Sequence, residues 1–298
     1  MPTAPDIDLS FVRYVQARKG DAAARLREGA AYAYSGDLKV RQTLDRVRPV
    51  TLAVEATVRF WQSVGKGQLL GSAIKVGEKQ FPKIHALLKS CADALQIPVP
   101  ALYISPEVAL GAHTFGTTDE ATIVVNGTLV DHLTAAELVS VLGHECGHIQ
   151  NNHVVYMTTL YFLTNAANLF VRWGTKPAVL ALNAWSRRAE LTCDRASLLC
   201  SKSLEVSTAA LVKLAIGSRK LYSDVNVDEY LRQLDAAAGS AGRFGELLST
   251  HPYLPKRVQA LRLFAGTALF KSVVGDKSPG GISKVECDAL VGELVSVL

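Results

Sequence analysis

The 298-residue sequence predicts a mostly helical α+β fold with a small sheet of three to four strands. Two observations lead to this prediction. Long Ala-, Leu- and Val-rich stretches occupy most of the chain, whereas short strand-like runs gather only between residues 101 and 126. The hydrophobic fraction of 49% and the charged fraction of 20% are typical of a globular protein that can bury a sizeable core.

The N-terminal part, residues 1–77, is expected to form a helical segment. Its Ala-, Leu- and Arg-rich stretches are interrupted at residues 35–37 (Ser-Gly-Asp) and 48–49 (Arg-Pro), and three glycines then loosen the chain. A helix is expected next over residues 82–95. The Ile-Pro-Val-Pro sequence that follows should stop it, because proline cannot continue a helix.

The sheet is expected from short runs rich in β-branched residues, separated by turn residues. These runs are residues 101–105, 112–116 and 122–126.

A strong helix is expected after the sheet. Thr134 and Glu137 form a T-x-x-E capping box, so the helix should begin there and continue to about Asn152. Near the C-terminus, Ser283 and Glu286 should cap a last apolar helix after a Gly- and Pro-containing linker. Further helices are expected at residues 153–172, 177–200, 207–222, 227–238 and 255–265.

The charge and cysteine content exclude some classes of protein. The net charge of +5 is mild and dispersed, and the basic stretches at residues 13–27 and 41–48 are interpreted as solvated helix faces, so nucleic acid is not an expected partner. The five cysteines lack a disulfide-type spacing, and the N-terminus is polar without a basic or apolar leader. These features predict free thiols and a cytoplasmic protein.

An uncharged run at residues 154–171 raises the question of membrane contact. It is near the lower length limit for a membrane-spanning helix, but it contains three Thr and two Asn and is closed by Arg172. A helix buried in the protein core is the favoured interpretation. Membrane contact through this run, with a peripheral membrane location, is the alternative.

The motif that indicates chemistry is H-E-x-x-H at residues 144–148, inside the capped helix. At about 100° per residue, His148 lies only about 40° round the helix from His144, so both imidazoles can bind one zinc ion. Glu145 can act as a general base toward a water that the metal activates. Cys146 points away from this face and is interpreted as a core residue. The alternative is a helix whose His and Glu side chains form only salt bridges.

A catalytic zinc site needs a third protein ligand. Residues 190–194 supply E-x-x-x-D on a second predicted helix, with Glu190 and Asp194 one turn apart on one face. One of them can bind zinc while the other accepts a hydrogen bond from a ligand imidazole.

The other histidines and cysteines are interpreted as structural. His153 is placed on a different helical face from His148 and is read as a surface or packing residue. His85 and His132 have no partner motif. Cys193 and Cys200 are seven residues apart and are interpreted as a buried pair rather than as a redox or metal site.

The sequence resembles the HtpX-like and CAAX-prenyl-protease-like gluzincins of metallopeptidase family forty-eight. The resemblance covers residues 81–262. It rests on H-E-C-G-H at 144–148, E-L-T-C-D at 190–194, and Thr-His-Pro at 250–252 followed by Arg257. It implies a gluzincin fold with a catalytic domain at residues 78–270, followed by a linker and C-terminal helix at 271–298.

The resemblance also implies a role for each matching residue. His144, His148 and Glu190 would bind one zinc ion, with Glu145 as general base and proton shuttle. Asp194 would orient a ligand histidine. Two further residues, His251 and Arg257, would stabilise the oxyanion or hold the substrate backbone, and in some relatives the histidine that matches His251 swings onto the zinc.

A peptide or protein substrate is expected to pair with the edge strand near Ala112, His113 and Thr114. The sequence departs here from the Asn-Ala-Phe-like element of many relatives. His113 could replace the missing Asn, or it could be an ordinary edge-strand residue.

The expected function is zinc-dependent endopeptidase activity. One alternative is a latent or inactive zinc-binding protein that acts through partners, with residues 1–75 or 284–298 over the cleft. Another is HtpX-like, membrane-associated protein quality control, which depends on lipid contact of residues 154–171.

Overall fold

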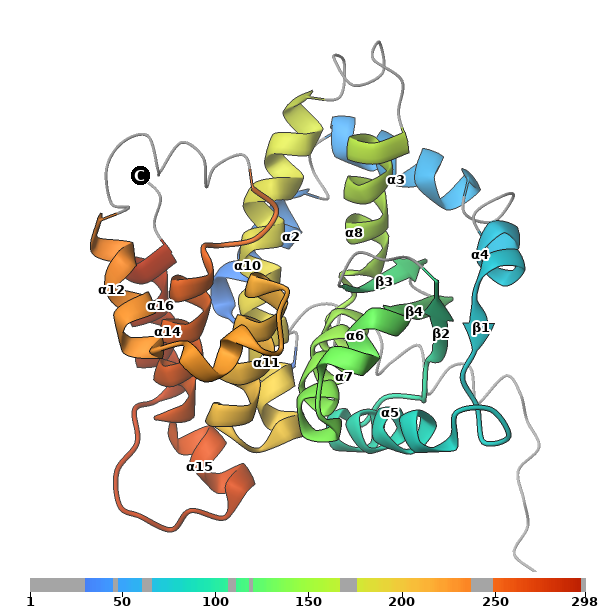
Figure 1. Cartoon of the computed structure of the whole chain (residues 1–298). Coiled ribbons are helices and arrows are strands. Elements are labelled where there is room, and N and C mark those ends of the chain that lie inside the picture. Colours follow the sequence, from blue (N-terminus) through green and yellow to red (C-terminus); the bar gives the residue numbers. More distant parts are fainter. Residues whose placement is uncertain are drawn as a thin grey trace, which may run out of the picture.

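The computed structural model describes residues 30–44, 48–60, 66–106, 111–117, 120–166, 176–236 and 249–295. Within these ranges the chain is mostly helical and contains one four-stranded sheet (Figure 1). The predicted fold class is confirmed. The expected helices before residue 30, the basic stretch at 13–27 and the end of the uncharged run at 167–171 lie outside the described residues.

The sheet has the strand order β1-β2-β4-β3. The parallel pair at its centre is β2 and β4, and the outer pairs are antiparallel. The two-residue strand β1 was not predicted, since two residues are too short for an alternating pattern. Among the described strands β3 lies at an edge. The bounds are β1 (Ile74–Lys75), β2 (Ala101–Ser105), β3 (Ala112–Gly116) and β4 (Ala121–Asn126).

The helices largely follow the predicted ranges. The predicted interruptions near Ser35 and Arg48 are helix starts, and the glycines after residue 65 fall in a short helix. The bounds are α2 (Ser35–Leu44), α3 (Arg48–Phe60), α4 (Lys66–Ser72), α5 (Pro82–Leu95), α6 (Gly127–His132), α7 (Ala135–Gln150), α8 (Val154–Tyr161), the π-helix η2 (Phe162–Ala166), α10 (Lys176–Ser201), α11 (Leu204–Ile216), the 3₁₀-helix η3 (Leu221–Asp224), α12 (Val227–Ala236), α14 (Leu254–Ala265), α15 (Ala268–Val274) and α16 (Lys284–Val295).

Helix α7 begins at the predicted capping box. The Thr134 amide donates to Oε2 of Glu137 at 2.9 Å, and the Glu137 amide donates to Oγ1 of Thr134 at 3.3 Å. The helix ends at Gln150, and Asn152 then adopts a left-handed conformation with φ of 58°. The chain therefore turns at Asn152 instead of continuing the helix, and this turn determines the position of His153.

Helix α7 packs directly against α10 through two glycines one turn apart. A Cβ atom on Gly147 would lie 2.7 Å from Cβ of Ala196, and one on Gly143 would lie 2.7 Å from Cβ of Cys200. Such distances are shorter than any van der Waals contact, so only glycine allows the two helices to approach this closely. The approach fixes the distance between the H-E-x-x-H helix and the helix that carries Glu190 and Asp194.

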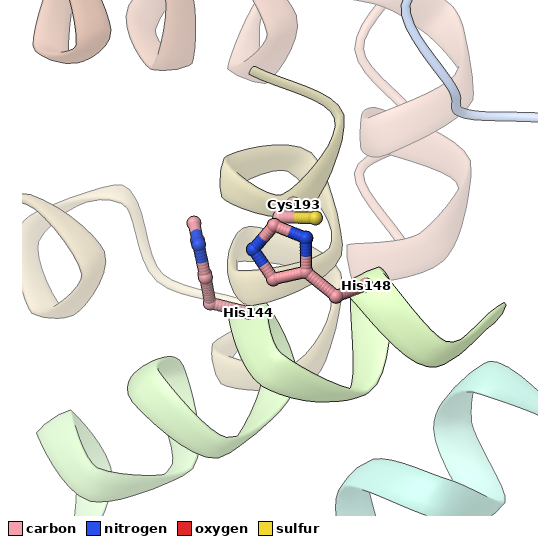
Figure 2. A group of neighbouring side chains, drawn as sticks. All are labelled: His144, His148 and Cys193. Carbon is pink, nitrogen blue, oxygen red and sulfur yellow. The ribbon is translucent and has the colours of Figure 1, made fainter. Parts of the chain in front are cut away.

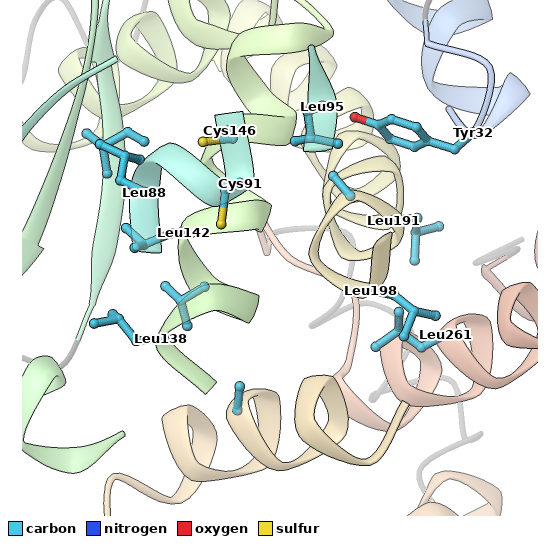
Figure 3. Close-up of a cluster of buried hydrophobic side chains, with 14 of the residues drawn as sticks. Tyr32, Leu88, Cys91, Leu95, Leu138, Leu142, Cys146, Leu191, Leu198 and Leu261 are labelled. Atoms are coloured by element: carbon cyan, nitrogen blue, oxygen red, sulfur yellow. The ribbon is translucent and has the colours of Figure 1, made fainter. Parts of the chain in front are cut away.

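One hydrophobic core contains described residues from each of the segments that were expected to be separate. Figure 3 shows part of this core. Tyr32 and Tyr34 come from the N-terminal part, Leu142 and Leu191 from α7 and α10, and Cys287 from α16. A second cluster lies between α2, α3, α8 and α10, around the fully buried Trp185. Packing among the described residues is thus continuous across residues 77 and 270, and the predicted division into segments stays a prediction.

A buried ion pair ties α16 to α10. Arg195 donates to Oδ1 of Asp288 at 2.7 Å, and Lys284 and the amide of Ser35 contact the other carboxylate oxygen. Burial raises the pKa of Asp288, but the neighbouring Arg195 and Lys284 outweigh this effect and hold the pKa below its usual value. The last helix is therefore an integral part of the fold.

Most of the described part of the uncharged run packs inside the molecule, although Tyr161 is 50% exposed. Val154, Leu160 and Leu163 are almost completely buried. Among the described residues no helix has the length and apolar character needed to cross a bilayer. Membrane contact through the run and a cytoplasmic location both remain predictions.

Replacing Gly147 with Ala should disturb the α7–α10 contact. The added methyl group has no space, so we expect the free energy of unfolding to fall by about 1–3 kcal/mol. Denaturant unfolding of the metal-free protein measures this. Gly67→Ala is the matched control, because a Cβ there meets nothing within 4 Å. Equal stability of the two variants would contradict the proposed role of the close helix contact.

Candidate metal centre and active site

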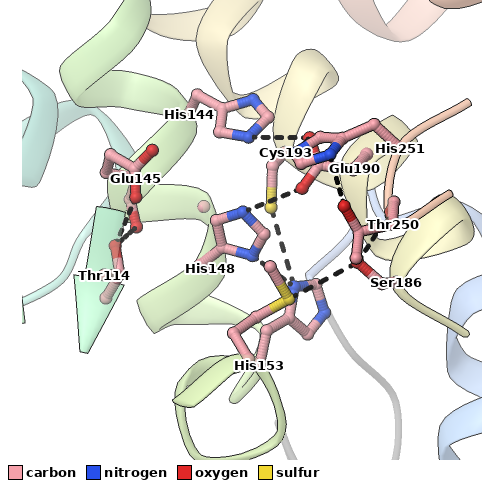
Figure 4. A network of polar contacts seen from close by, with 12 residues as sticks. Thr114, His144, Glu145, His148, His153, Ser186, Glu190, Cys193, Thr250 and His251 are labelled. Carbon is pink, nitrogen blue, oxygen red and sulfur yellow. Dashed lines mark hydrogen bonds and ion pairs between the residues drawn. The ribbon is translucent and has the colours of Figure 1, made fainter. Parts of the chain in front are cut away.

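Three donor side chains from α7 and α10 converge in the cleft between these helices (Figure 4). Nε2 of His144 lies 3.4 Å from Oε2 of Glu190, and Nε2 of His148 lies 3.5 Å from Oε1 of the same carboxylate. Glu190 and His148 are buried. The two histidines project from one face of α7, as their spacing predicts.

These distances fit a zinc ion. Bonds of about 2.0–2.2 Å from zinc to nitrogen and oxygen place tetrahedral ligand atoms roughly 3.4 Å apart. Two imidazoles and one carboxylate are also a donor set that zinc uses in catalytic sites. Burial raises the pKa of Glu190, but nearby His251, Arg257 and His144 outweigh it and keep the pKa well below its usual value, so the carboxylate is available as an anion.

Asp194 lies behind His144 and is itself held by Arg257. Nδ1 of His144 is 3.1 Å from Oδ1 of Asp194. Arg257 donates to both oxygens of this carboxylate, at 2.9 Å and 2.6 Å, and also contacts Glu190 at 3.1 Å. Arg257 was expected to touch the substrate. Its described contacts are with the two carboxylates, which makes it suited to positioning them.

The two carboxylates act strongly on His144. Burial lowers its pKa, but Glu190 and Asp194 outweigh burial and raise the pKa to about 10. In the metal-free protein this imidazole therefore carries a proton near neutral pH.

Glu145 is held by a residue of the edge strand. Oγ1 of Thr114 donates to Oε2 of Glu145 at 2.6 Å, and both side chains are buried. Thr114 was expected to contact substrate through its backbone. The structure adds a side-chain contact to Glu145 that the spacing of strand residues could not reveal, because it depends on how α7 packs on β3.

His251 lies at the open side of the site, with 53% of its side chain exposed. Its Nε2 is 3.6 Å from Oε2 of Glu190, and its Nδ1 is 2.7 Å from Oγ1 of Thr250. The backbone next to His251 is held to α10, because the hydroxyl of Ser186 donates to the carbonyl of Thr250 at 2.9 Å. His251 and Glu190 are thus brought together despite 61 residues of separation.

Two cavities flank the donor cluster. One has a volume of about 450 Å³ and the other about 210 Å³, and both are bordered by His144, Glu145, Glu190, His251 and the edge strand at Ala112 and His113. The larger cavity is walled by side chains of α11 and the start of α14: Ala210, Leu211, Leu214, Ala215 and Leu254. The smaller is walled by Phe115, Met157, Leu160 and Tyr161.

Cys193 also lies near the donor histidines. Its sulfur and one nitrogen each of His144 and His148 lie within 4.8 Å of one another (Figure 2). The sulfur is 3.6 Å from Nδ1 of His153, whereas Cys200 points toward the carbonyl of Cys91. Cys193 and Cys200 therefore have different neighbours, contrary to the expected buried pair. Cys146 is a buried core residue, as expected, and all five cysteines are free thiols.

His153 was expected to be a surface or packing residue on a different face from His148. It is a packing residue, but it does not lie on a separate face. It is 1% exposed and lies against His148, with 3.3 Å between the two Nδ1 atoms. The expectation of a separate face assumed a helix that continues past Asn152. Because the chain turns there, His153 folds back beneath His148.

Comparison with known proteins agrees with this geometry. Residues 78–265 match the sequence profile of Peptidase family M48. The chain belongs to this family of metallopeptidases. As an M48 metallopeptidase it is expected to use a metal cofactor.

Curated M48-like relatives are similar over part of their length. The Plastoglobule-localized metallopeptidase 48 of Arabidopsis thaliana is 36% identical over 168 residues, which are 55% of this chain and 49% of the relative, so the chain matches about half of that protein. A Protease HtpX homolog of Moorella thermoacetica is 26% identical over 64% of this chain and 74% of the relative. Another, from Halobacterium salinarum, is 26% identical over 74% and 91%. No solved structure matches the chain significantly.

Zinc binding to the metal-free M48 peptidase should release a proton even at alkaline pH. At pH 8.5 an ordinary imidazole is already about 99% neutral, but His144, with its pKa near 10, is still protonated and must lose the proton to bind metal. We expect about one proton per zinc, and weaker binding as the pH falls. Calorimetry in two buffers of different ionisation enthalpy measures the number of protons released per zinc ion bound. Identical enthalpies in both buffers would contradict the raised pKa.

Proposed function

We propose that the protein is a zinc-dependent endopeptidase, with His144, His148 and Glu190 as metal ligands and Glu145 as general base. The observation that supports this most is that the Nε2 atoms of His144 and His148 each lie about 3.5 Å from one of the two oxygens of Glu190. The Glu145 carboxylate borders the same cavities. Membership of a metallopeptidase family supports the reaction class. A zinc ion held there would supply Lewis acidity to the attacking water and the scissile carbonyl.

The side chains divide the remaining work. Glu145 would take a proton from the attacking water and return it to the leaving amine, and Thr114 would hold its carboxylate at a fixed angle. Asp194, clamped by Arg257, would keep the Nε2 lone pair of His144 directed at the metal. His251, which is 53% exposed beside Glu190, would donate to the developing oxyanion.

The substrate would lie extended along β3 and pair with its backbone. This strand borders both cavities, which lie on the two sides of the donor cluster. Their walls are largely aliphatic or aromatic, so apolar side chains are expected on both sides of the cleaved bond.

Two substitutions separate metal binding from catalysis. Glu145→Gln removes the base but no ligand, so it should retain about one zinc per chain and lose activity by about 100-fold or more. Glu190→Ala removes a ligand and should lose zinc. Metal analysis and mass spectrometry of a mixed peptide library, cleaved by wild type and by each variant, measure both properties. Loss of zinc from Glu145→Gln with zinc retained by Glu190→Ala would reverse the assignment.

A second candidate is a latent form of the same site. His251 Nε2 lies 3.6 Å from Glu190 Oε2, about the same spacing as the ligand atoms, so this imidazole is near enough to serve as a further metal ligand.

His251→Ala distinguishes the two candidates. If His251 stabilises the oxyanion, kcat should fall by about 100- to 1,000-fold with little change in KM. If His251 instead blocks the site, its removal should raise kcat above that of the wild type. Steady-state kinetics on a cleaved library peptide gives the answer, and His85→Ala, on α5, is the control.

A further inference from the structure

The two histidines of α7 are supported in different ways. Both direct Nε2 toward Glu190, so the Nδ1 atom of each must carry the proton when Nε2 binds a metal. Nδ1 of His144 meets the carboxylate of Asp194. Nδ1 of His148 instead meets another imidazole, that of His153, at 3.3 Å. This second contact has no role yet in the proposed function.

The fold holds His153 firmly in this position. After the left-handed turn at Asn152, the amide of His153 donates to the carbonyl of His148 at 2.9 Å. Its ring packs edge-on against His148, with 5.4 Å between centroids, and against Trp185, with 5.3 Å. The ring is therefore fixed by the backbone on one side and by an aromatic wall on the other.

The other nitrogen of His153 meets a buried carboxylate from the N-terminal part of the chain. Nε2 of His153 is 3.0 Å from Oδ2 of Asp37, which is 3% exposed. Thr192 donates to the same oxygen at 2.8 Å, and Nε1 of Trp185 donates to Oδ1 at 2.9 Å. Three donors thus fix the orientation of a single carboxylate.

One arrangement of protons satisfies all these contacts. His148 donates from Nδ1, so Nδ1 of His153 must accept, and Nε2 of His153 must donate to Asp37. The sulfur of Cys193 is a second, more distant neighbour of the accepting Nδ1, at 3.6 Å. Asp37 thus sets the tautomer of His153, and His153 in turn sets the tautomer of the metal ligand His148.

We infer that His153 and Asp37 form a buried relay that positions His148 for metal binding, as Asp194 does for His144. The inference rests on the proposed zinc site. Carboxylates behind ligand histidines fix the ring and increase its basicity. Here the carboxylate acts through a second imidazole.

The relay makes the N-terminal part of the chain a component of the metal site. Asp37 lies on α2, outside the residues 78–265 that match the family profile. Helix α2 supplies this carboxylate to the metal site.

Three variants test the relay through zinc affinity. Asp37→Asn puts a donor where only acceptors fit, and His153→Phe removes both ring nitrogens at similar size. Each should weaken zinc binding by about 10- to 100-fold. His153→Asn retains an oxygen able to accept from His148, so it should weaken binding less than His153→Phe. Competition with a chromophoric chelator gives the dissociation constants, and the visible spectrum of the cobalt-substituted protein reports changed ligand geometry.

Asp288→Asn is the matched control. It makes the same change to a buried carboxylate that pairs with Arg195 and lies outside the relay. The amide oxygen introduced at this position can still accept from the amide of Ser35 at the start of α2, so the variant should reduce stability and leave zinc affinity and the cobalt spectrum unchanged. Should Asp37→Asn fail to fold, the two His153 variants carry the same test.

The outcomes separate the relay from the function on which it rests. Wild-type zinc affinity in both Asp37→Asn and His153→Phe, or an equal loss in Asp288→Asn, would overturn the relay alone. A wild-type protein that binds zinc no better than His148→Ala would overturn the proposed function together with the relay.

Discussion

The close contact between α7 and α10 is the constraint on which the rest of the site depends. Gly143 and Gly147 remove the side chains that would hold the helices apart, and small residues of α10 fill the opposite surface. Only at this separation can one carboxylate of α10 reach two imidazoles of α7 at ligand distance. The capping box fixes where α7 begins, and this start fixes which residues of α7 face α10. The close contact in turn sets the positions of the donor atoms.

The packing around α7, α10 and α2 also buries several charges, and neighbouring groups compensate each of them. Burial alone would raise the pKa of Glu190, Asp194 and Asp37, yet each carboxyl has a lowered pKa because partners with charge or donor groups surround it. Arg257 lowers the pKa of Glu190 and Asp194, whereas His153, Thr192 and Arg41 lower that of Asp37. An unpaired carboxylate at this depth would cost several kcal/mol. The partners therefore stabilise the fold and orient the donors at the same time.

Much of this arrangement could be predicted from local sequence patterns. The strands near residues 101–126, the capping box at Thr134 and the shared face of His144 and His148 all depend on spacings within one element. The role of His153 was missed for a local reason, since the helix ends before it and the assumed periodicity no longer applies. The role of Asp37 and the side-chain contact between Thr114 and Glu145 were missed for a different reason. Their contacts join residues 116 and 31 positions apart, which only the packing of α2 and β3 brings together.

The proposed metal ligands are His144, His148 and Glu190. Cys193 lies near the same histidines and is not proposed as a ligand. A crystal structure of the zinc-loaded protein, with anomalous data collected on both sides of the zinc absorption edge, tests this most directly. We expect one strong anomalous peak about 2.0–2.2 Å from Nε2 of both histidines and from an oxygen of Glu190. A peak bonded to the sulfur of Cys193, or one that does not touch Glu190, would contradict it.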